Sequence, residues 1–514
     1  MLETSTIVAL ILLATGIGLV FTRMARGIAA RVGMLDAPDG DRKKQAVPIP
    51  VAGGVAVLAA ALLTLLLIAL ADPQVADALT ENPRKSLSLL AAAVLITAIG
   101  VIDDRYNMRA KHKLVGQILA ISTLVVGGDF IIHSIGVFGY AIELGRFEIP
   151  FTVLWLLACV NALNLIDGMD GLLGTIGCIA LVALAIIAAI SGHIFAASLA
   201  LALAGAVFGF LWWNLPPATI YMGDAGSMLI GLVVGAVAIP ASLKGPALIS
   251  LGAPLAILVL PVFDTAAAII RRKLTGRSFA AADCGHMHHR MMERGLTPTG
   301  VLRILGILGV IASAGALGSI AWNNDLYALL AAGSVVLALI ASRLFGHSEL
   351  GLIRARASNL VRKALIRDTG AWGLAVHLQG KANWEQIWNE LTELAGRLKL
   401  QTMNLDVNAP AMRENYHARW NSPFAGHSKC LLQLEVPLFG KNGSALGQLS
   451  IAIARDARPL TDAFATIARL IEILEQRAAS LSGSSSSGPR PAANHVVAVL
   501  PVPPQTMTPV PLRV

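Results

Sequence analysis

The 514-residue chain has few charged side chains. Asp, Glu, Lys and Arg make up 14% of it, whereas hydrophobic residues make up 55%. An ordinary soluble domain is about a quarter charged, so this balance is typical of a membrane protein. Cysteine is also scarce: the four cysteines are scattered and form neither a disulfide framework nor the spacing of a metal knuckle. The first apolar run lacks a small-residue cleavage site, so we expect a first membrane span there rather than a removable signal peptide.

The formal net charge of +9 does not indicate a nucleic-acid partner. Its lysines and arginines lie between apolar segments instead of on one polar face with interleaved aromatic residues. Membrane topology explains these positive charges better, so we expect contacts with membrane lipid and no nucleic acid.

Ten or eleven apolar segments are long enough to cross a bilayer, which needs about 20 residues per helix. The sequence thus predicts an all-α polytopic membrane protein with a C-terminal cytoplasmic α+β domain. The third, fourth and fifth segments are short or polar at one end. The candidate spans are 5–22, 49–70, 87–102, 114–127, 150–165, 174–191, 193–213, 226–243, 247–270, 301–320 and 325–344.

The distribution of lysine and arginine predicts the orientation. Loops 23–47, 103–113 and 271–300 together carry sixteen of these residues, whereas the loops expected on the opposite side carry four. Positive loops stay in the cytoplasm. We therefore expect the N-terminus outside and the C-terminal region inside.

Acidic residues gather at the cytoplasmic ends of the predicted spans, and acids near a membrane are functional candidates by default. In the segment from Asn161 to Asp170, amides and acids recur at helical spacing and offer carbonyl and carboxylate oxygens. Asp224 lies between glycines at a helix start, where a ligand can approach the backbone closely. Magnesium prefers such oxygen ligands. The candidate acids are Asp103, Asp104, Asp167, Asp170, Asp224 and Asp264.

Basic side chains accompany these acids on the predicted cytoplasmic side. Lys113, Arg271, Arg272 and the run from His286 to Arg290 could neutralise a pyrophosphate, as phosphoryl transfer requires. Simpler interpretations stay open: Asp103 and Asp104 could cap a solvated helix end, and the histidine cluster could be a solvated loop or a fortuitous metal site.

Five segments, in this order, resemble the polyprenyl-phosphate N-acetylhexosamine-1-phosphate transferase family, closest to its bacterial undecaprenyl-phosphate N-acetylglucosamine branch. The resemblance covers about residues 1–345. One departure is Gln45, where the family often has histidine. The segments are Pro48 to Gly54, Gly100 to Asp104 with Lys113 to Gln117, Asn161 to Leu172, Met222 to Ser227, and His286 to His289.

The resemblance implies roles for individual residues. Asp103 and Asp104 would be the catalytic pair, with either acid as base or nucleophile, and Lys113 would complete the catalytic set by holding the diphosphate. Asp224 would bind Mg²⁺ with help from Asn164, and Mn²⁺ is an alternative metal. Asp167 and Asp170 would lie beside the nucleotide, and His286 and His288 at the diphosphate. The complete substrate-binding set would be Asn161, Asn164, Asp167, Asp170, His286, His288 and His289.

The implied reaction moves an N-acetylhexosamine-1-phosphate from a UDP-sugar to undecaprenyl phosphate and starts a cell-envelope polysaccharide. Met287 interrupts the histidine run, which favours N-acetylglucosamine over the muramoyl-pentapeptide donor of peptidoglycan synthesis, the alternative within the family. A transporter is the alternative from another class, but its coupling acids would lie near the bilayer midplane. Homodimerisation stays open.

The chain changes character after the last apolar segment. Residues 346–370 are basic and suit a juxtamembrane linker beside anionic lipid. Residues 371–478 predict one small accessory α+β domain, with a strand from Gly373, a helix over 382–398, a hairpin around Asn442 and a closing helix over 460–478. No catalytic spacing is evident there. Residues 479–514 are rich in Ser and Pro and predict disorder.

Overall fold

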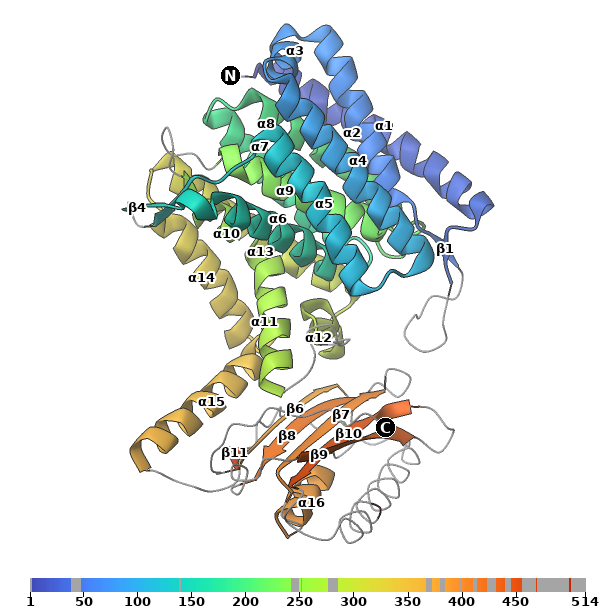
Figure 1. The fold of residues 1–514 in the computed structure, drawn as a ribbon. Helices are drawn as coiled ribbons and strands as arrows, with labels where there is room; N and C mark the ends of the chain where they lie inside the picture. Colours follow the sequence, from blue (N-terminus) through green and yellow to red (C-terminus); the bar gives the residue numbers. More distant parts are fainter. Residues whose placement is uncertain are drawn as a thin grey trace. The chain divides into compact units, whose positions relative to one another are not determined.

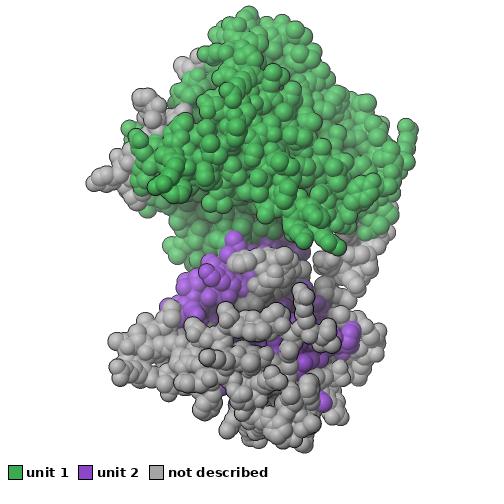
Figure 2. All heavy atoms as spheres, in the orientation of Figure 1, with its two compact units in different colours: residues 1–38, 45–266, 290–342 green, residues 39–44, 267–289, 343–514 purple. Residues whose placement is uncertain are grey.

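The computed structural model shows a helical membrane region followed by a mixed α/β region (Figure 1). The residues that it describes are 2–37, 48–137, 140–241, 249–250, 252–275, 285–366, 372–379, 384–397, 400–409, 414–422, 431–439, 445–454, 468 and 499–500. Two compact units are coloured in Figure 2. Unit 1 contains residues 1–38, 45–266 and 290–342, and unit 2 contains residues 39–44, 267–289 and 343–514.

Unit 1 consists mainly of long apolar helices. Among the described residues, eight helices have the length and apolarity of a membrane crossing, and the prediction of a polytopic membrane protein is confirmed. The most buried of them are α8 and α9. The eight are α1 (Thr4–Val32), α2 (Gly53–Ala71), α4 (Pro83–Tyr106), α6 (Glu148–Ile166), α7 (Leu172–Ile190), α8 (Ile194–Asn214), α9 (Gly223–Ala241) and α13 (Pro298–Ala321).

The other three predicted spans correspond to shorter or more polar helices. The fourth is α5 (Ala110–Gly128), whose first turn carries lysines. The ninth is broken into α10 (Gly252–Ile257) and α11 (Val259–Thr275), and the last is α14 (Leu326–Ala341), with 16 residues. Two short helices, α3 (Pro73–Thr80) and α12 (Met287–Glu293), lie in connections.

Local signals explain several helix ends. The Asn82 side chain accepts a hydrogen bond from the backbone N–H of Lys85 and caps α4, whose first residue is Pro83. Thr297 caps α13 in the same way. At the other end, α4 stops where Asn107 adopts the left-handed conformation, with φ of 48°.

The segments that connect the helices of unit 1 contain short paired strands. β1 (Leu35–Asp36) pairs with β2 (Ile49–Pro50). β3 (Ser134–Val137) and β4 (Tyr140–Glu143) form a hairpin, and β5 (Ile249–Ser250) pairs with β3. A single 3₁₀ turn, Gly145–Phe147, precedes α6. The sequence interpretation left β1, β3, β4 and this turn in loops, whereas it placed the residues of β2 and β5 at the starts of the predicted spans 49–70 and 247–270.

Unit 2 contains α15 (His347–Ile366), α16 (Trp384–Arg397) and an antiparallel sheet. In the sheet the strands follow the order β11, β6, β8, β7, β10, β9. The predicted first strand and helix are confirmed as β6 and α16, and the predicted hairpin as β9 and β10. The strands are β6 (Trp372–Gln379), β7 (Thr402–Ala409), β8 (Glu414–Asn421), β9 (Leu431–Phe439), β10 (Ala445–Ala454) and β11 (Val499–Leu500).

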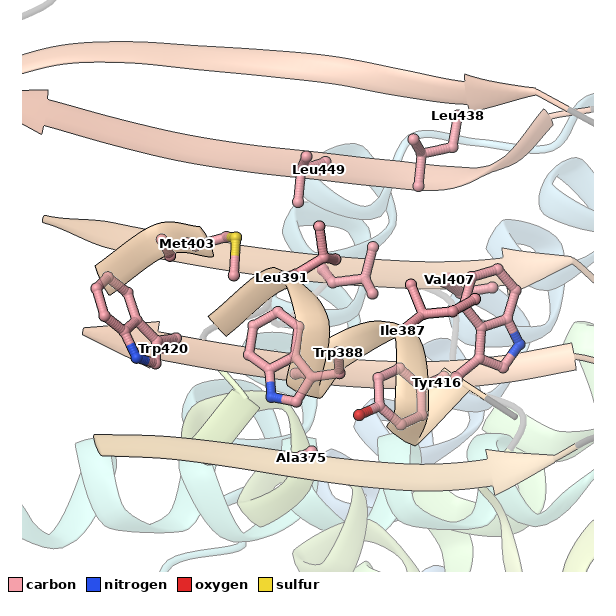
Figure 3. Packing of buried hydrophobic residues seen from close by; sticks show 14 of the residues in the cluster. Ala375, Ile387, Trp388, Leu391, Met403, Val407, Tyr416, Trp420, Leu438 and Leu449 are labelled. Carbon is pink, nitrogen blue, oxygen red and sulfur yellow. The ribbon is translucent and has the colours of Figure 1, made fainter. Parts of the chain in front are cut away.

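The sheet packs one face against α16, as Figure 3 shows. Trp384, Trp388 and Leu391 of the helix lie among residues from the strands, including Tyr416 and Trp420. Such aromatic residues bury large apolar areas. The contacts form a separate hydrophobic core, as expected of an accessory α+β domain.

Strands β7 and β8 were not predicted from the sequence, and most of the C-terminal segment lies outside the described residues. The sequence interpretation missed β7 and β8, because every second residue on them is a polar residue that is partly or fully buried. The predicted helix over 460–478 lies outside the described residues, except for Ala468 in a helix, and so does the Ser/Pro-rich tail, except for β11. The boundaries at 345, 370 and 478 stay predictions.

Candidate active site

A lysine joins two carboxylates from different helices of unit 1. The Nζ atom of Lys113, in the first turn of α5, lies 2.9 Å from Oδ2 of Asp103 and 2.7 Å from Oδ2 of Asp224. The Asp103 side chain belongs to the last turn of α4, and Asp224 to the first turn of α9. Three helix ends therefore meet at the Lys113 ammonium.

An amide from α6 completes this cluster. Nδ2 of Asn164 donates to Oδ1 of Asp224, at 2.5 Å, and to Oγ of Ser227, at 2.8 Å. Its Oδ1 accepts from Lys113 at 3.3 Å. Asn164 thus holds Asp224 in place while its oxygen faces the cation position. We name the cluster Asp103, Lys113, Asn164 and Asp224 the acidic centre.

Asp104 has a different environment from its neighbour. Its carboxylate accepts hydrogen bonds from the backbone N–H groups of Asp224, at 2.8 Å, and Ala225, at 3.3 Å. These N–H groups begin α9 and have no partner within the helix. Asp104 therefore caps α9 from α4, and it fixes where Asp224 stands.

Glycines let the helices carrying these residues come together. A Cβ atom at Gly100 of α4 would lie 2.2 Å from Cα of Ala225, and one at Gly54 of α2 would lie 2.2 Å from N of Gly226. The backbones of Gly53 and Gly54 also donate to the carbonyls of Tyr221 and Met222. Glycines from three of the predicted segments thus allow α2, α4 and α9 to pack closely together.

Two further predicted residues of unit 1, Asn161 and Asp170, make hydrogen bonds outside the acidic centre. Nδ2 of Asn161 donates to Oε1 of Gln117 and to the carbonyl of Leu157, so this amide bonds to α5 and to its own helix. Oδ2 of Asp170 accepts from the N–H of Ala218.

Asp167 follows the end of α6. Burial raises the pKa of its carboxyl to about 8, and the charges of Asp224, Asp104 and Asp170 add to the rise. A protonated carboxyl can donate a hydrogen bond to a ligand.

The acidic centre has the oxygen donors that magnesium needs. Among the described residues, no group of three or more His, Cys, Asp or Glu side chains is placed to hold a metal. Magnesium, however, is usually bound by one or two carboxylates together with substrate phosphates. The Lys113 ammonium already lies between two carboxylates, so the residues present fit a cation at this position.

The predicted histidines belong to unit 2. The His286 and His288 side chains are buried, and their rings are nearly parallel with centroids 6.3 Å apart. The His289 ring lies next to His288, at 4.2 Å. Gly285 precedes this cluster, and a Cβ there would lie 2.7 Å from the Arg271 guanidinium.

Arg271 is held by a residue that the sequence did not single out. Its Nη1 atom lies 2.5 Å from Oε1 of Glu349, in the first turn of α15, and both side chains are almost fully buried. Oγ of Ser348 donates to the other oxygen of Glu349. The sequence interpretation also missed Ser227 as the partner of Asn164, although the Gly-Ser ending of its segment was a signal.

Comparisons with known proteins identify the family of this chain. The model of glycosyl transferase family 4 matches residues 86–242, which contain the acidic centre. A probable undecaprenyl-phosphate N-acetylglucosaminyl 1-phosphate transferase of Bacillus subtilis is 32% identical over 300 residues, 58% of this chain and 81% of the relative. An Escherichia coli O157:H7 undecaprenyl-phosphate alpha-N-acetylglucosaminyl 1-phosphate transferase is 30% identical over 378 residues, 72% of this chain and 98% of the relative.

Another group of relatives carries a different lipid in its name. The decaprenyl-phosphate N-acetylglucosaminephosphotransferase of Mycobacterium tuberculosis H37Rv is 31% identical over 345 residues, 62% of this chain and 84% of the relative. The aligned lengths and the order of the motifs leave one assignment. This chain is a multi-pass membrane protein of glycosyl transferase family 4 and belongs to its polyprenyl-phosphate N-acetylglucosamine-1-phosphate transferases.

Proposed function

We propose that the protein transfers N-acetylglucosamine-1-phosphate from UDP-N-acetylglucosamine to undecaprenyl phosphate, and that the reaction takes place at the cytoplasmic face of a bacterial inner membrane. An oxygen of the lipid phosphate attacks the β-phosphorus of the donor. The bond from that phosphorus to the bridging oxygen breaks, and UMP leaves. The observation that supports this most is the acidic centre, where Asp103, Lys113 and Asp224 meet from three helix ends.

We further propose that Mg²⁺ is held by Asp224, with Asp103 and the Asn164 oxygen beside it. When bound, the metal would neutralise charge on phosphate oxygens. Lys113 would then bind an oxygen of the donor diphosphate, because its ammonium already lies within 3 Å of the same carboxylates. The donor set has the composition expected for magnesium.

Asp103 and Asp104 have separable roles in this proposal. Asp104 is occupied by two backbone N–H groups and acts through the position of α9. Oδ2 of Asp103 forms an ion pair with Lys113. Asp103 is the candidate to accept a proton from the lipid phosphate. Asn can still accept one N–H bond, so Asp104→Asn should retain more turnover than Asp103→Asn.

The test is formation of lipid-linked product by the purified full chain. UDP-N-acetylglucosamine and undecaprenyl phosphate should give undecaprenyl-diphosphate-N-acetylglucosamine and an equal amount of UMP, and chelation of divalent cations should stop the reaction. UDP-N-acetylmuramoyl-pentapeptide should not replace the donor. Product from that donor alone would move the chain to the peptidoglycan branch, and decaprenyl phosphate as the better acceptor would correct the lipid.

A further inference from the structure

The accessory sheet has a second face that carries polar side chains on its two central strands. Met403 and Leu405 of β7 and Trp420 of β8 lie in the core against α16. Side chains alternate between the faces of a strand, so the intervening residues point to the opposite face. These intervening residues are Asn404, Asp406 and Asn408 on β7, and Asn415, His417 and Arg419 on β8. We call the six the polar array.

The register of β7 and β8 places the polar array in facing pairs. Asn408 lies opposite Asn415, Asp406 opposite His417, and Asn404 opposite Arg419. Directly opposite residues have their Cβ atoms about 4.5–5.5 Å apart, so the six side chains form one continuous patch. In the middle pair, Nδ1 of His417 lies 2.6 Å from Oδ1 of Asp406.

Several atoms of the polar array are buried without a hydrogen-bond partner. Asn415 is 1% exposed, and neither its amide oxygen nor its amide nitrogen has a partner within the described structure. The same is true of Oδ1 of Asn404 and Asn408 and of Nε of Arg419. Buried polar atoms are nearly always paired in natural proteins. Four such residues on one face therefore indicate that another molecule supplies the missing groups.

The charges of the polar array favour the binding of an anion. No ion pair with a carboxylate involves Arg419 in the part of the chain that the structure describes, and Asp406 is engaged with His417. Burial lowers the pKa of the Arg419 guanidinium, and the positive charge of Arg356 on α15 lowers it further. A buried cation beside a second cation is stabilised by a bound anion.

We propose that the polar array binds a small phosphate-bearing ligand, a sugar phosphate or a nucleotide. Arg419 would pair with the phosphate, because a guanidinium matches phosphate oxygens in two hydrogen bonds. The amides of Asn404, Asn408 and Asn415 both donate and accept, so they suit hydroxyl groups or a base edge. None of these residues belongs to the acidic centre, so the proposal stands apart from the transfer reaction.

The test measures ligand binding to the full chain in phosphatidylcholine nanodiscs by calorimetry. The probes are inorganic phosphate, N-acetylglucosamine 1-phosphate and UMP. A chain stopped at Gly370 lacks the sheet and reports binding at the transfer site alone. We expect the full chain to bind one additional equivalent of at least one probe, and Arg419→Met and Asn415→Leu each to weaken that binding at least tenfold. Glu435→Gln, on the exposed side of β9, is the matched control.

Thermal unfolding measured without probe shows whether each variant is folded before its binding is compared. Asn415→Leu removes an unpaired buried amide, so its unfolding temperature should equal or exceed that of the parent, while the rise caused by the probe disappears. Absence of the additional equivalent, or undiminished binding by Arg419→Met, would overturn the proposal. Nanodiscs with phosphatidylglycerol provide the last arm: unchanged probe binding supports a soluble ligand, whereas its loss would assign the phosphate to a lipid headgroup and refute the small-ligand assignment.

Discussion

Asp224→Asn is the most direct perturbation of the acidic centre, because it removes one negative charge with almost no change in volume. The carboxylate accepts from Lys113 at 2.7 Å and from Asn164 at 2.5 Å, one bond to each oxygen. An asparagine has one oxygen and one NH₂ group. Whichever way it is oriented, its NH₂ group meets either the Lys113 ammonium or the Asn164 amide as a second donor.

The magnitude follows from the two contributions that are lost. A hydrogen bond to a charged group is worth about 1.5–3 kcal/mol, and metal stabilisation of a phosphoryl oxygen several kcal/mol. Removal of one such electrostatic contact in an enzyme commonly costs about 10²–10³ in turnover, or about 2.7–4 kcal/mol. We expect a loss in that range at saturating magnesium and a larger loss at limiting magnesium.

The assay is turnover of UDP-N-acetylglucosamine as a function of magnesium concentration, per molecule of folded protein. Asp129→Asn is the matched control, because Asp129 is exposed at the end of α5 and adopts the left-handed conformation that asparagine tolerates. Turnover of Asp224→Asn near that of the parent at limiting magnesium would refute the metal assignment. A variant that fails to fold would be recognised by its thermal unfolding before any turnover is compared.

The other predictions concern packing, coupling and topology. Gly100→Ala should reduce the yield of folded protein in size-exclusion chromatography, because its Cβ would overlap the backbone of Ala225; normal yield would contradict the described packing of α4 on α9. Glu349→Gln should raise KM for the UDP-sugar about tenfold and leave KM for the lipid unchanged, since the Arg271 guanidinium against Gly285 loses its contact with a charged carboxylate; equal changes in both would indicate general damage. Cysteines at Lys43, Arg109 and Arg294 should be labelled only from the cytoplasm and those at Gln74 and Ile142 only from outside, and labelling at Arg109 from the periplasm would invert the proposed orientation. A chain stopped at Gly370 should insert and keep its turnover, and a folded but inactive truncated chain would show that the sheet is part of the active site.

The sequence predicted the acidic centre because its residues follow local rules. Lys113, Asp103 and Asp224 each lie at a helix end, and the charge of the loops placed these ends on one side before any contact was known. The partners that depend on three-dimensional packing were not predictable in this way. Ser227 became a partner of Asn164 only through the approach of α6 to α9.

In the accessory domain, less of the structure could be predicted from the sequence. The hairpin of β9 and β10 was predictable because a Lys-Asn-Gly turn separates two apolar runs. Strands β7 and β8 were missed, since a buried polar residue at every second position resembles an exposed strand or a loop. Their pairing has to be seen before Asn415 and Arg419 can be placed on one face.

The Arg271–Glu349 pair determines where this protein could be divided or recombined. Glu349 lies after the last apolar helix, within a segment that by composition alone reads as a linker, yet it neutralises an arginine of α11 that packs against the residue before the histidine cluster. A chimera joined at residue 345 would remove the Glu349 carboxylate from that buried arginine. Exchange of the accessory domain between relatives should therefore work best at junctions after the first turn of α15, which keep this ion pair.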